Sequence, residues 1–382
     1  HGSRGGALFI THYFHNMMKN GNVSPQSSIL SQTITFLRLP LIVAVVYIHT
    51  HPGHVVLDGI PVADKDTFPA FSFFQYVITE ELARIAVPLF FFISGFLFFY
   101  RSGFSTRIYG QKLRKRVRTL LVPYVLWNAA FFLVMFCAQA FLHVSPDKYP
   151  AIEEFGWLDW LNIFWSYKGG MPASYQFWFV RDLMVAVLLS PVLYLIVKHL
   201  KAFGVFALGV LWLFGIWFHV TGFNIDAFFF FAFGAWYSMN KCDFTAVFGR
   251  VRLGATCAYL ILLVVNTWLW HINVTDYSFL LRLGIFTGLV AVVSWTAHGI
   301  SKNRLRVSAF LASSSFFVYA YHVLPVAMVV KTYVRLLPHA DDWAFVAGYL
   351  LIPLFISAVG VGIYALLHRY LPAFTAVITG GR

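Results

Sequence analysis

Residues 82–100, LARIAVPLFFFISGFLFFY, form an apolar run with a single charged side chain, Arg84. A helix needs about 20 mostly apolar residues to cross a bilayer, so this run predicts a membrane-spanning helix. The whole chain has this character, being 59% hydrophobic and 11% charged with a mean hydropathy of +0.72. Soluble globular proteins are about 25% charged. The composition therefore predicts an all-α, polytopic integral membrane protein rather than two or three soluble domains.

Ten segments have the length and apolarity of a crossing, and together they predict a helix bundle with both termini on one side of the membrane. We expect this membrane domain to cover residues 33–367. Residues 1–32, which begin with His1, form an N-terminal segment that is either flexible or left from an expression vector, and residues 368–382 form a cytoplasmic tail. The ten segments are 33–50, 82–100, 117–142, 177–197, 202–220, 225–239, 251–271, 278–300, 307–333 and 343–367.

Charge patterning orients these crossings. Residues 101–118 contain seven basic and no acidic side chains, and the basic stretches 198–201, 250–252 and 302–306 fall on the same side. Basic loops stay in the cytoplasm, so both termini are expected there and the localisation is the cytoplasmic (inner) membrane. The net charge of +13 follows from this loop bias, and no nucleic-acid partner is expected. The acidic residues expected on the opposite side include Asp58, Asp64, Asp66, Glu80, Glu81, Asp147, Glu153, Glu154, Asp159, Asp276, Asp341 and Asp342.

Three polar residues inside predicted crossings are candidates for chemistry, because a charge there costs about 2.5–3.5 kcal/mol. His49 and His322 reach a similar depth on two outward-running helices, so they could share one pocket. The alternative for each is a core histidine bonded to a backbone carbonyl. Arg38 lies eleven residues before His49 and therefore on nearly the same helix face. Its alternative is an arginine whose charge reaches back to the membrane surface.

Other charged residues lie closer to the membrane surfaces. Arg181 and Asp182 point in different directions on a helix, so we expect them to serve different partners, with a structural ion pair to another helix as the alternative. Glu81 and Arg84 are equally consistent with interfacial anchoring. The six cations between Arg107 and Arg118 exceed what topology needs, and such clusters bind phosphates. The three cysteines are far apart and predict neither disulfides nor a metal site.

Five strings, in order from about Thr33 to Leu367, resemble membrane acyltransferase family 3. Each is weak alone, but the ordered set is fairly specific. One departure concerns the basic motif, which is usually Arg-x-x-Arg and here reads Lys115-x-x-Arg118. The strings are TFLR at 35–38 with ten residues between Arg38 and His49, VPLFFFISGFL at 87–97, RKRVR at 114–118 ahead of Pro123-Tyr124, WFVRDL at 178–183 and SFFVYAYH at 315–322.

The resemblance implies transfer of an acyl group, usually acetyl, from cytoplasmic acetyl-CoA to a hydroxyl of an extracytoplasmic or lipid-linked glycan. His49 would be the general base and Arg38 or His322 the oxyanion donor, while an acetyl-histidine intermediate stays open. CoA would bind Arg114, Arg116 and Arg118, and its pantetheine arm would pass Ser94. The expected acceptor contacts are Glu81, Arg84, Trp178, Arg181 and Asp182.

Two other functions remain possible from the residues. A transporter or flippase would also need intramembrane charges, although such proteins often show repeated halves and no repeat is visible in this sequence. A non-catalytic subunit of polysaccharide assembly could keep the same scaffold. The spacing of Arg38 and His49 favours an enzyme over that scaffold. Acceptor sugar, acyl length and oligomeric state are not encoded in any motif that we recognise.

Overall fold

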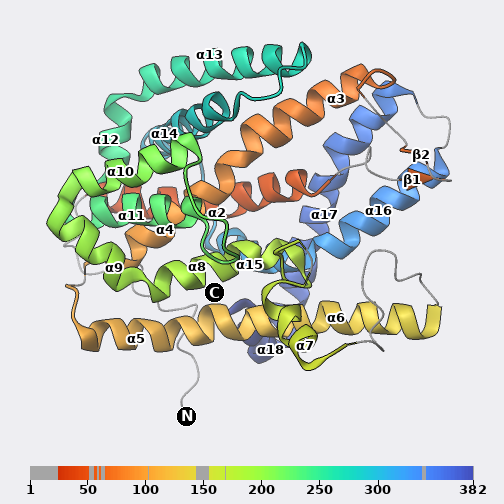
Figure 1. Cartoon of the computed structure of the whole chain (residues 1–382), viewed down its shortest axis with the longest axis horizontal. Coiled ribbons are helices and arrows are strands. Elements are labelled where there is room, and N and C mark those ends of the chain that lie inside the picture. Colours follow the sequence, from red (N-terminus) through yellow and green to blue (C-terminus); the bar gives the residue numbers. More distant parts are fainter. Residues whose placement is uncertain are drawn as a thin grey trace.

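The computed structural model describes residues 25–50, 56–57, 60–61, 65–101, 103–142, 155–167, 169–337 and 341–381. Most of the N-terminal segment and the acidic residues Asp58, Asp64, Asp147, Glu153 and Glu154 lie outside them. Within the described residues the chain is almost entirely helical, as predicted, apart from one two-residue antiparallel pair that joins Val56 to Pro61 and Leu57 to Ile60. Figure 1 shows α13 and the α5–α6 run lying roughly along the longest axis of the molecule, whereas α17 crosses that axis steeply.

The elements in chain order are α2 (Pro25–Ile48), β1 (Val56–Leu57), β2 (Ile60–Pro61), α3 (Pro69–Tyr76), η2 (Val77–Leu82), η3 (Ala83–Ile85), α4 (Ala86–Phe99), α5 (Thr106–Arg116), η4 (Val117–Leu121), α6 (Val122–Leu142), α7 (Trp157–Trp165), η7 (Tyr175–Phe177), α8 (Trp178–Leu188), α9 (Ser190–Leu195), η8 (Ile196–Leu200), α10 (Lys201–Phe214), α11 (Ile225–Met239), α12 (Phe244–Arg250), α13 (Arg252–His271), α14 (Ser278–Ser301), α15 (Ala309–Tyr321), α16 (Val323–Leu336), α17 (Asp342–Tyr370) and α18 (Pro372–Thr379).

Seven helical runs in the described part of the chain are long and apolar enough to cross a membrane, or eight if the bent pair α15–α16 counts as one span. The multi-pass helical class is therefore confirmed, whereas the count of ten and the side of the termini stay predictions. The seven runs are Ser28–Ile48, Pro69–Phe99, Thr106–Phe141, Ser190–Phe214, Arg252–His271, Ser278–Ser301 and Asp342–Tyr370.

Prolines account for two of the differences from the predicted crossings. The segment 177–197 divides into α8 and α9 at Leu189, just before Pro191, and 307–333 divides into α15 and α16 just before Pro325. Proline lacks the N–H that would bond the carbonyl four residues earlier, and its ring clashes with that carbonyl. By contrast, α11 has the predicted bounds of 225–239.

Two helical runs begin earlier than predicted. The second starts at Pro69, so α3 and η2 occupy part of the stretch between the predicted crossings 33–50 and 82–100. The third starts at Thr106, which places the basic cluster on α5 and η4 rather than in a loop. The α5 and α6 helices follow one another along the lower edge of Figure 1.

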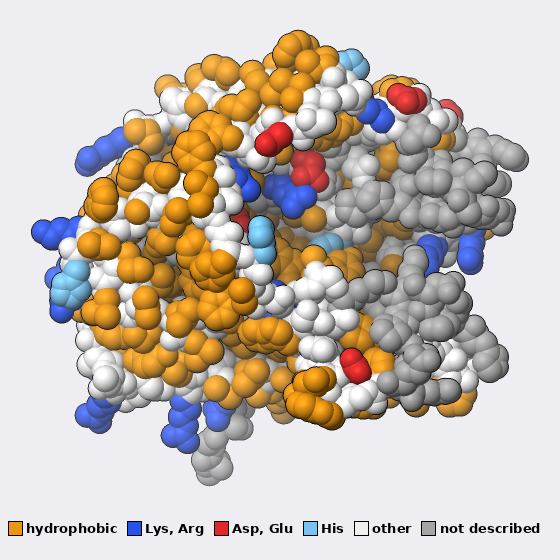
Figure 2. All heavy atoms as spheres, viewed as in Figure 1, with side chains coloured by type: hydrophobic (Ala, Val, Ile, Leu, Met, Phe, Trp, Pro, Cys, Tyr) orange, Lys and Arg blue, Asp and Glu red, His pale blue; other side chains and the backbone are white. Residues whose placement is uncertain are grey.

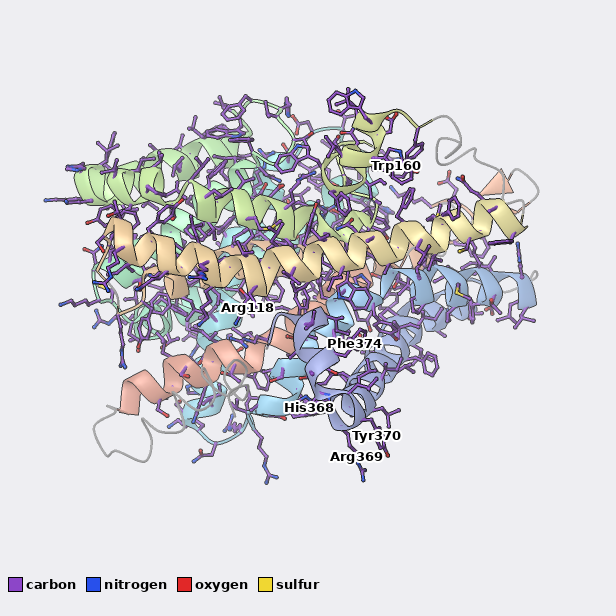
Figure 3. The ribbon with its side chains drawn as sticks, turned by 90° about the horizontal axis from the view of Figure 1, so that it is seen from below. Arg118, Trp160, His368, Arg369, Tyr370 and Phe374 are labelled. Atoms are coloured by element: carbon purple, nitrogen blue, oxygen red, sulfur yellow. The ribbon has the colours of Figure 1, made fainter. Side chains whose placement is uncertain are left out.

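Both expected end segments are partly helical. Helix α2 already begins at Pro25, and α18 packs against α6 in place of an extended tail. The Trp127 indole on α6 donates a hydrogen bond to the Ile378 carbonyl at 2.9 Å. Figure 3 shows α18, which carries Phe374, beside the long α5–α6 run.

The closest helix crossing in the core joins α4 to α11. A Cβ added to Gly95 on α4 would lie 2.0 Å from the Phe231 carbonyl oxygen, and one added to Gly234 on α11 would lie 1.9 Å from the Phe92 carbonyl oxygen. Two glycines thus let the backbones touch, as in other membrane helix pairs. The glycine of the Ser94-Gly95-Phe96 string therefore has a packing reason.

We predict that Gly95→Ala destabilises the protein by about 1–3 kcal/mol or more, because the added methyl overlaps the backbone of α11. Gly110→Ala on α5 is the control, since a Cβ there meets nothing within 4 Å. That change should be neutral or stabilise α5 by up to about 1 kcal/mol. Thermal unfolding of the purified protein in detergent compares the two, and equal midpoints would contradict the close crossing.

Candidate active site

The structure brings His49 and His322 together. Their ring centroids lie 5.3 Å apart with an interplanar angle of 30°. His49 directly follows the end of α2, and its backbone N–H still bonds the carbonyls of Val45 and Val46 at 3.3 and 3.2 Å. His322 lies at the break between α15 and α16, where the chain bends by 65°. Since α2 packs against α15, the ends of two helices meet at the imidazoles.

The buried His322 ring is held in one tautomer. Its Nδ1 lies 2.6 Å from the Tyr319 carbonyl oxygen. A carbonyl can only accept, so Nδ1 carries the proton and the Nε2 of the neutral ring carries a lone pair. That Nε2 is buried and has no hydrogen-bond partner within the described part of the chain. His322 is thus prepared to accept a proton or a hydrogen bond at Nε2.

Tyr319 also fixes the neighbouring turn η7. Its hydroxyl donates to the Gln176 carbonyl at 2.6 Å, and the Gln176 amide donates in return to the Ala320 carbonyl at 3.1 Å. This reciprocal pair of hydrogen bonds holds η7 against the last turn of α15. It places the Tyr175 ring edge-on to His49, with centroids 5.0 Å apart.

Arg38 and Ser94 lie on α2 and α4, two helices that pack together. Both residues are partly buried. No hydrogen bond or ion pair engages the Arg38 side chain among the described residues, although Arg38 is inside a candidate span. Eleven residues at 1.5 Å each put Arg38 about 16 Å from His49 along α2, near the same helix face.

Arg181 and Asp182 do not serve different partners, contrary to the sequence interpretation. Arg181 Nε donates to Asp182 Oδ1 at 2.9 Å, and the two side chains are 5% and 3% exposed. The guanidinium reaches beyond its own helix. It also donates to the carbonyls of Trp165 and Gly170, both at 2.6 Å. The pair therefore ties the segment after α7 to α8, which is a structural use of both charges.

Glu81 and Arg84 belong to separate contacts. The buried Glu81 carboxyl accepts from the Tyr76 hydroxyl at 3.2 Å and from the Asn266 amide at 3.4 Å, so it joins η2 to α13. Arg84 forms an ion pair with Glu80 at 2.9 Å and its side chain is 50% exposed. Trp178 begins α8 and is partly buried. The hydrogen bonds and the ion pair of Glu81 and Arg84 thus run to Tyr76, Asn266 and Glu80 rather than to either imidazole.

The basic helix presents cations on its surface. Arg114 and Arg118 are exposed and Arg116 is partly buried. Figure 3 shows Arg118 on the α5–α6 run. Lys112 is anchored instead, because its ammonium donates to the Phe98 carbonyl and lies 4.7 Å from the centre of the Phe98 ring. The exposed arginines remain available to an anionic ligand.

The visible face of the molecule is mostly hydrophobic. Figure 2 shows Lys and Arg side chains projecting at the left and lower edges, and further ones at the centre and right, where the Asp and Glu side chains also lie. No group of three or more His, Cys, Asp or Glu side chains that could hold a metal occurs in the described ranges. The side chains that meet at the site are the imidazoles of His49 and His322 and the ring of Tyr175.

Comparison with known proteins identifies the family of this chain. Residues 32–367 match the family model described as an acyltransferase domain, acyltransferase family 3. The chain belongs to acyltransferase family 3.

One relative is named for succinoglycan biosynthesis. The acyltransferase chain is 30% identical over 176 residues to Succinoglycan biosynthesis protein ExoH of Rhizobium meliloti (strain 1021). The aligned part is 44% of this chain and 44% of the relative, so it spans less than half of the relative's length. No solved structure matches the chain.

Two residues of the candidate site were missed by sequence reasoning. Tyr175 lies between the predicted crossings 117–142 and 177–197, where nothing in the sequence singles it out from its neighbours. Tyr319 lies within the string that ends at His322, where it reads as one apolar residue among several. The sequence did contain a signal for the bend at His322. A proline three residues later, Pro325, indicates that the helix breaks there.

We predict that Tyr319→Phe destabilises the acyltransferase by about 1–3 kcal/mol, because the buried Gln176 carbonyl loses its donor. The carbonyl of residue 319 is unchanged, so the bond to His322 persists. Tyr370→Phe is the matched control, since Tyr370 is 67% exposed. Thermal unfolding in detergent measures both, and a shift for Tyr319→Phe no larger than the control's would refute the role of this bond.

Proposed function

We propose that this acyltransferase moves an acyl group, in the first instance acetyl, from cytoplasmic acetyl-CoA to a hydroxyl of an extracytoplasmic or lipid-linked glycan. Family membership supports the transferase class. The name of the relative, a succinoglycan biosynthesis protein, favours a polysaccharide or its lipid-linked precursor as the acceptor. The observation that carries the proposal is the meeting of His49 and His322 at the ends of two helices.

In this proposal His49 is the general base. It takes the proton of the acceptor hydroxyl while the hydroxyl oxygen attacks the thioester carbonyl. The C–S bond then breaks, and the CoA thiolate receives the proton from the imidazolium. A positioned base of this kind contributes about 10²–10⁴-fold to the rate. His322 adds a second proton-accepting nitrogen, because its Nδ1–H is already given to Tyr319.

The same bond weighs against His322 as the oxyanion donor, since its neutral Nε2 has no proton to donate. Arg38 lies about 16 Å from His49 along α2 by helical rise. That separation favours contact with the pantetheine arm of the donor rather than with the reacting carbonyl. An acetyl-histidine route remains compatible with either ring, because both would offer a lone pair to the thioester.

The donor side of the proposal uses the basic helix. CoA carries three phosphate groups, and arginine binds phosphate by paired, charge-assisted hydrogen bonds. Arg114, Arg116 and Arg118 are on one helical run that leads into a candidate span. Ser94 on α4 and Arg38 on α2 then mark a path between that run and the imidazoles.

On the acceptor side, Tyr175 is the residue best placed to meet a sugar. Its ring packs against His49, and aromatic rings stack readily on the apolar faces of sugars. Arg181, Asp182 and Glu81 are occupied by the protein contacts described above, so their part in acceptor binding is indirect, through the loop and helices that they hold. Trp178 and Arg84 keep partly exposed surfaces that an acceptor could reach.

We predict that His49→Ala lowers acetyl transfer by at least about 10²-fold, the usual contribution of a general base, while CoA binding is nearly unchanged. His199→Ala, at an exposed histidine, is the control. The measurement is acetyl-CoA turnover by the purified protein with a glycan acceptor. Full turnover by His49→Ala would remove His49 from the mechanism. Glycan export without thioester turnover by the wild type would favour a transporter.

We predict that Arg118→Ala weakens CoA binding roughly tenfold or more, because a charge-assisted contact to phosphate is worth about 1.5–3 kcal/mol. Arg107→Ala removes an exposed cation from the same helical run and should change the affinity far less. Equilibrium titration with CoA measures both dissociation constants. An unchanged constant for Arg118→Ala would place the donor elsewhere.

A further inference from the structure

A cavity of about 230 Å³ lies between α12, the start of α13, α14 and the start of α2. Its polar lining residues are Asp243, Thr245, Arg252, Ser294, His298 and Ser301. None of them has a role in the proposed acyl transfer. Figure 1 places α12 and the basic helix α5 far apart on the molecule, so this cavity is separate from the proposed CoA-binding arginines.

The Arg252 guanidinium is held against an aromatic ring and, among the described residues, forms no ion pair with a carboxylate. It lies 4.6 Å from the centre of the Trp295 ring. The Trp295 indole donates to the Thr256 hydroxyl at 2.9 Å, and that hydroxyl donates to the Arg252 carbonyl at 2.7 Å. The Arg252 Nε is buried and has no hydrogen-bond partner within the described residues. A buried donor left unpaired costs about 1–3 kcal/mol, so an acceptor that fills the cavity would relieve that cost.

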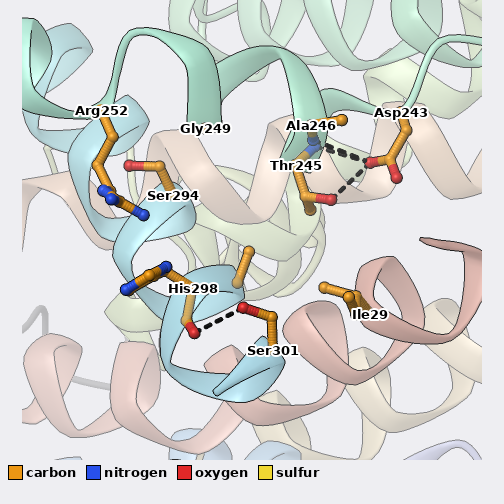
Figure 4. Close-up of a pocket in the computed structure, with 10 residues that line it drawn as sticks. Ile29, Asp243, Thr245, Ala246, Gly249, Arg252, Ser294, His298 and Ser301 are labelled. Atoms are coloured by element: carbon orange, nitrogen blue, oxygen red, sulfur yellow. Dashed lines mark hydrogen bonds between the residues drawn. The ribbon is translucent and has the colours of Figure 1, made fainter. Parts of the chain in front are cut away.

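Figure 4 shows the Arg252 guanidinium pointing from the start of α13 toward Ser294 and His298 on α14. The Ser294 and Ser301 hydroxyls already donate to the carbonyls of Ala291 and His298, at 2.9 and 2.8 Å. The donors that remain for a ligand are therefore the guanidinium and the His298 ring. Both suit an oxyanion with several acceptor oxygens.

The charge around the cavity is mainly positive. Lys302 and Arg304 lie within electrostatic range of His298, together with Arg252. The acidic residue in the lining, Asp243, is committed to capping α12, because its Oδ1 accepts from the Thr245 N–H, the Thr245 hydroxyl and the Ala246 N–H. The cavity therefore favours an anion at its α14 side.

Apolar side chains that neighbour lining residues in the sequence are exposed. Val247 on α12 follows Ala246 and is 37% exposed, while Val251, between α12 and α13, and Leu253 on α13 flank Arg252 and are 54% and 65% exposed. A basic pocket beside lipid-facing side chains at the end of membrane-spanning helices is the setting in which anionic lipid head groups bind. Arginine recognises phosphate through paired hydrogen bonds, which adds geometric selectivity to charge.

We propose that this cavity binds a phosphate group, held by Arg252 and His298. The phosphate could come from an anionic phospholipid head group or from a soluble phosphate compound, and the chemistry of recognition is shared. The site does not depend on the proposed acyl transfer, so the two proposals can fail separately.

The test uses the full chain in vesicles of phosphatidylcholine with and without phosphatidylglycerol, followed by native mass spectrometry of the retained lipid. A parallel titration with inorganic phosphate in pure phosphatidylcholine detects a soluble ligand. Arg252→Gln should weaken the binding about tenfold or more, as expected for a lost charge-assisted contact. Arg250→Gln is the matched control, because Arg250 is exposed and does not line the cavity.

Preferential retention of phosphatidylglycerol that Arg252→Gln abolishes assigns the site to a lipid, and phosphate binding with the same sensitivity assigns it to a soluble anion. Should Arg252→Gln fail to fold, Arg252→Lys and His298→Gln replace it, and each should weaken binding relative to Arg250→Gln. Equal losses in the Arg252 and Arg250 variants, or no selective binding of either probe by the wild type, would overturn the proposal.

Discussion

An interruption in a membrane-spanning helix frees backbone carbonyls that lipid cannot satisfy. Between α15 and α16 Pro325 cannot bond the Tyr321 carbonyl, and at the same bend the His322 ring donates to the Tyr319 carbonyl. This bond at the break also sets the tautomer of the imidazole. The same tyrosine holds η7 through its hydroxyl. The position of His322, the lone pair on its Nε2 and the placement of Tyr175 beside His49 all follow from this one turn.

Charges in the apolar part of the molecule fall into two kinds. Arg181, Asp182 and Glu81 are buried and bonded to the protein itself, so they stabilise the loop and helix contacts around the site. Arg38 is different, because it lies in a candidate span with no hydrogen-bond or ion-pair partner among the described residues. An unpaired cation in such a place is expensive and calls for a ligand. In the function that we propose, this ligand is the pantetheine arm of the acyl donor.

Sequence reasoning predicted the helical membrane class, the bounds of α11 and the meeting of His49 with His322, since apolar length and helical rise determine those features. It did not predict the breaks at Leu189 and His322, although Pro191 and Pro325 indicate that the helices break there. The partners of Arg181 and Glu81 could not be predicted, because they are carbonyls and side chains from distant segments such as Trp165 and Asn266. Tyr175 was missed for the same reason, since only the folded η7 brings it to His49.

The central claim is that His49 and His322 act as one unit at the junction of two helices. The most direct test is a double-mutant cycle on acetyl transfer with His49→Gln, His322→Gln and the double variant. Residues that share one chemical step are strongly non-additive. The account predicts that the double variant is about as slow as the slower single variant. Rate losses that multiply, or full activity without either imidazole, would contradict it.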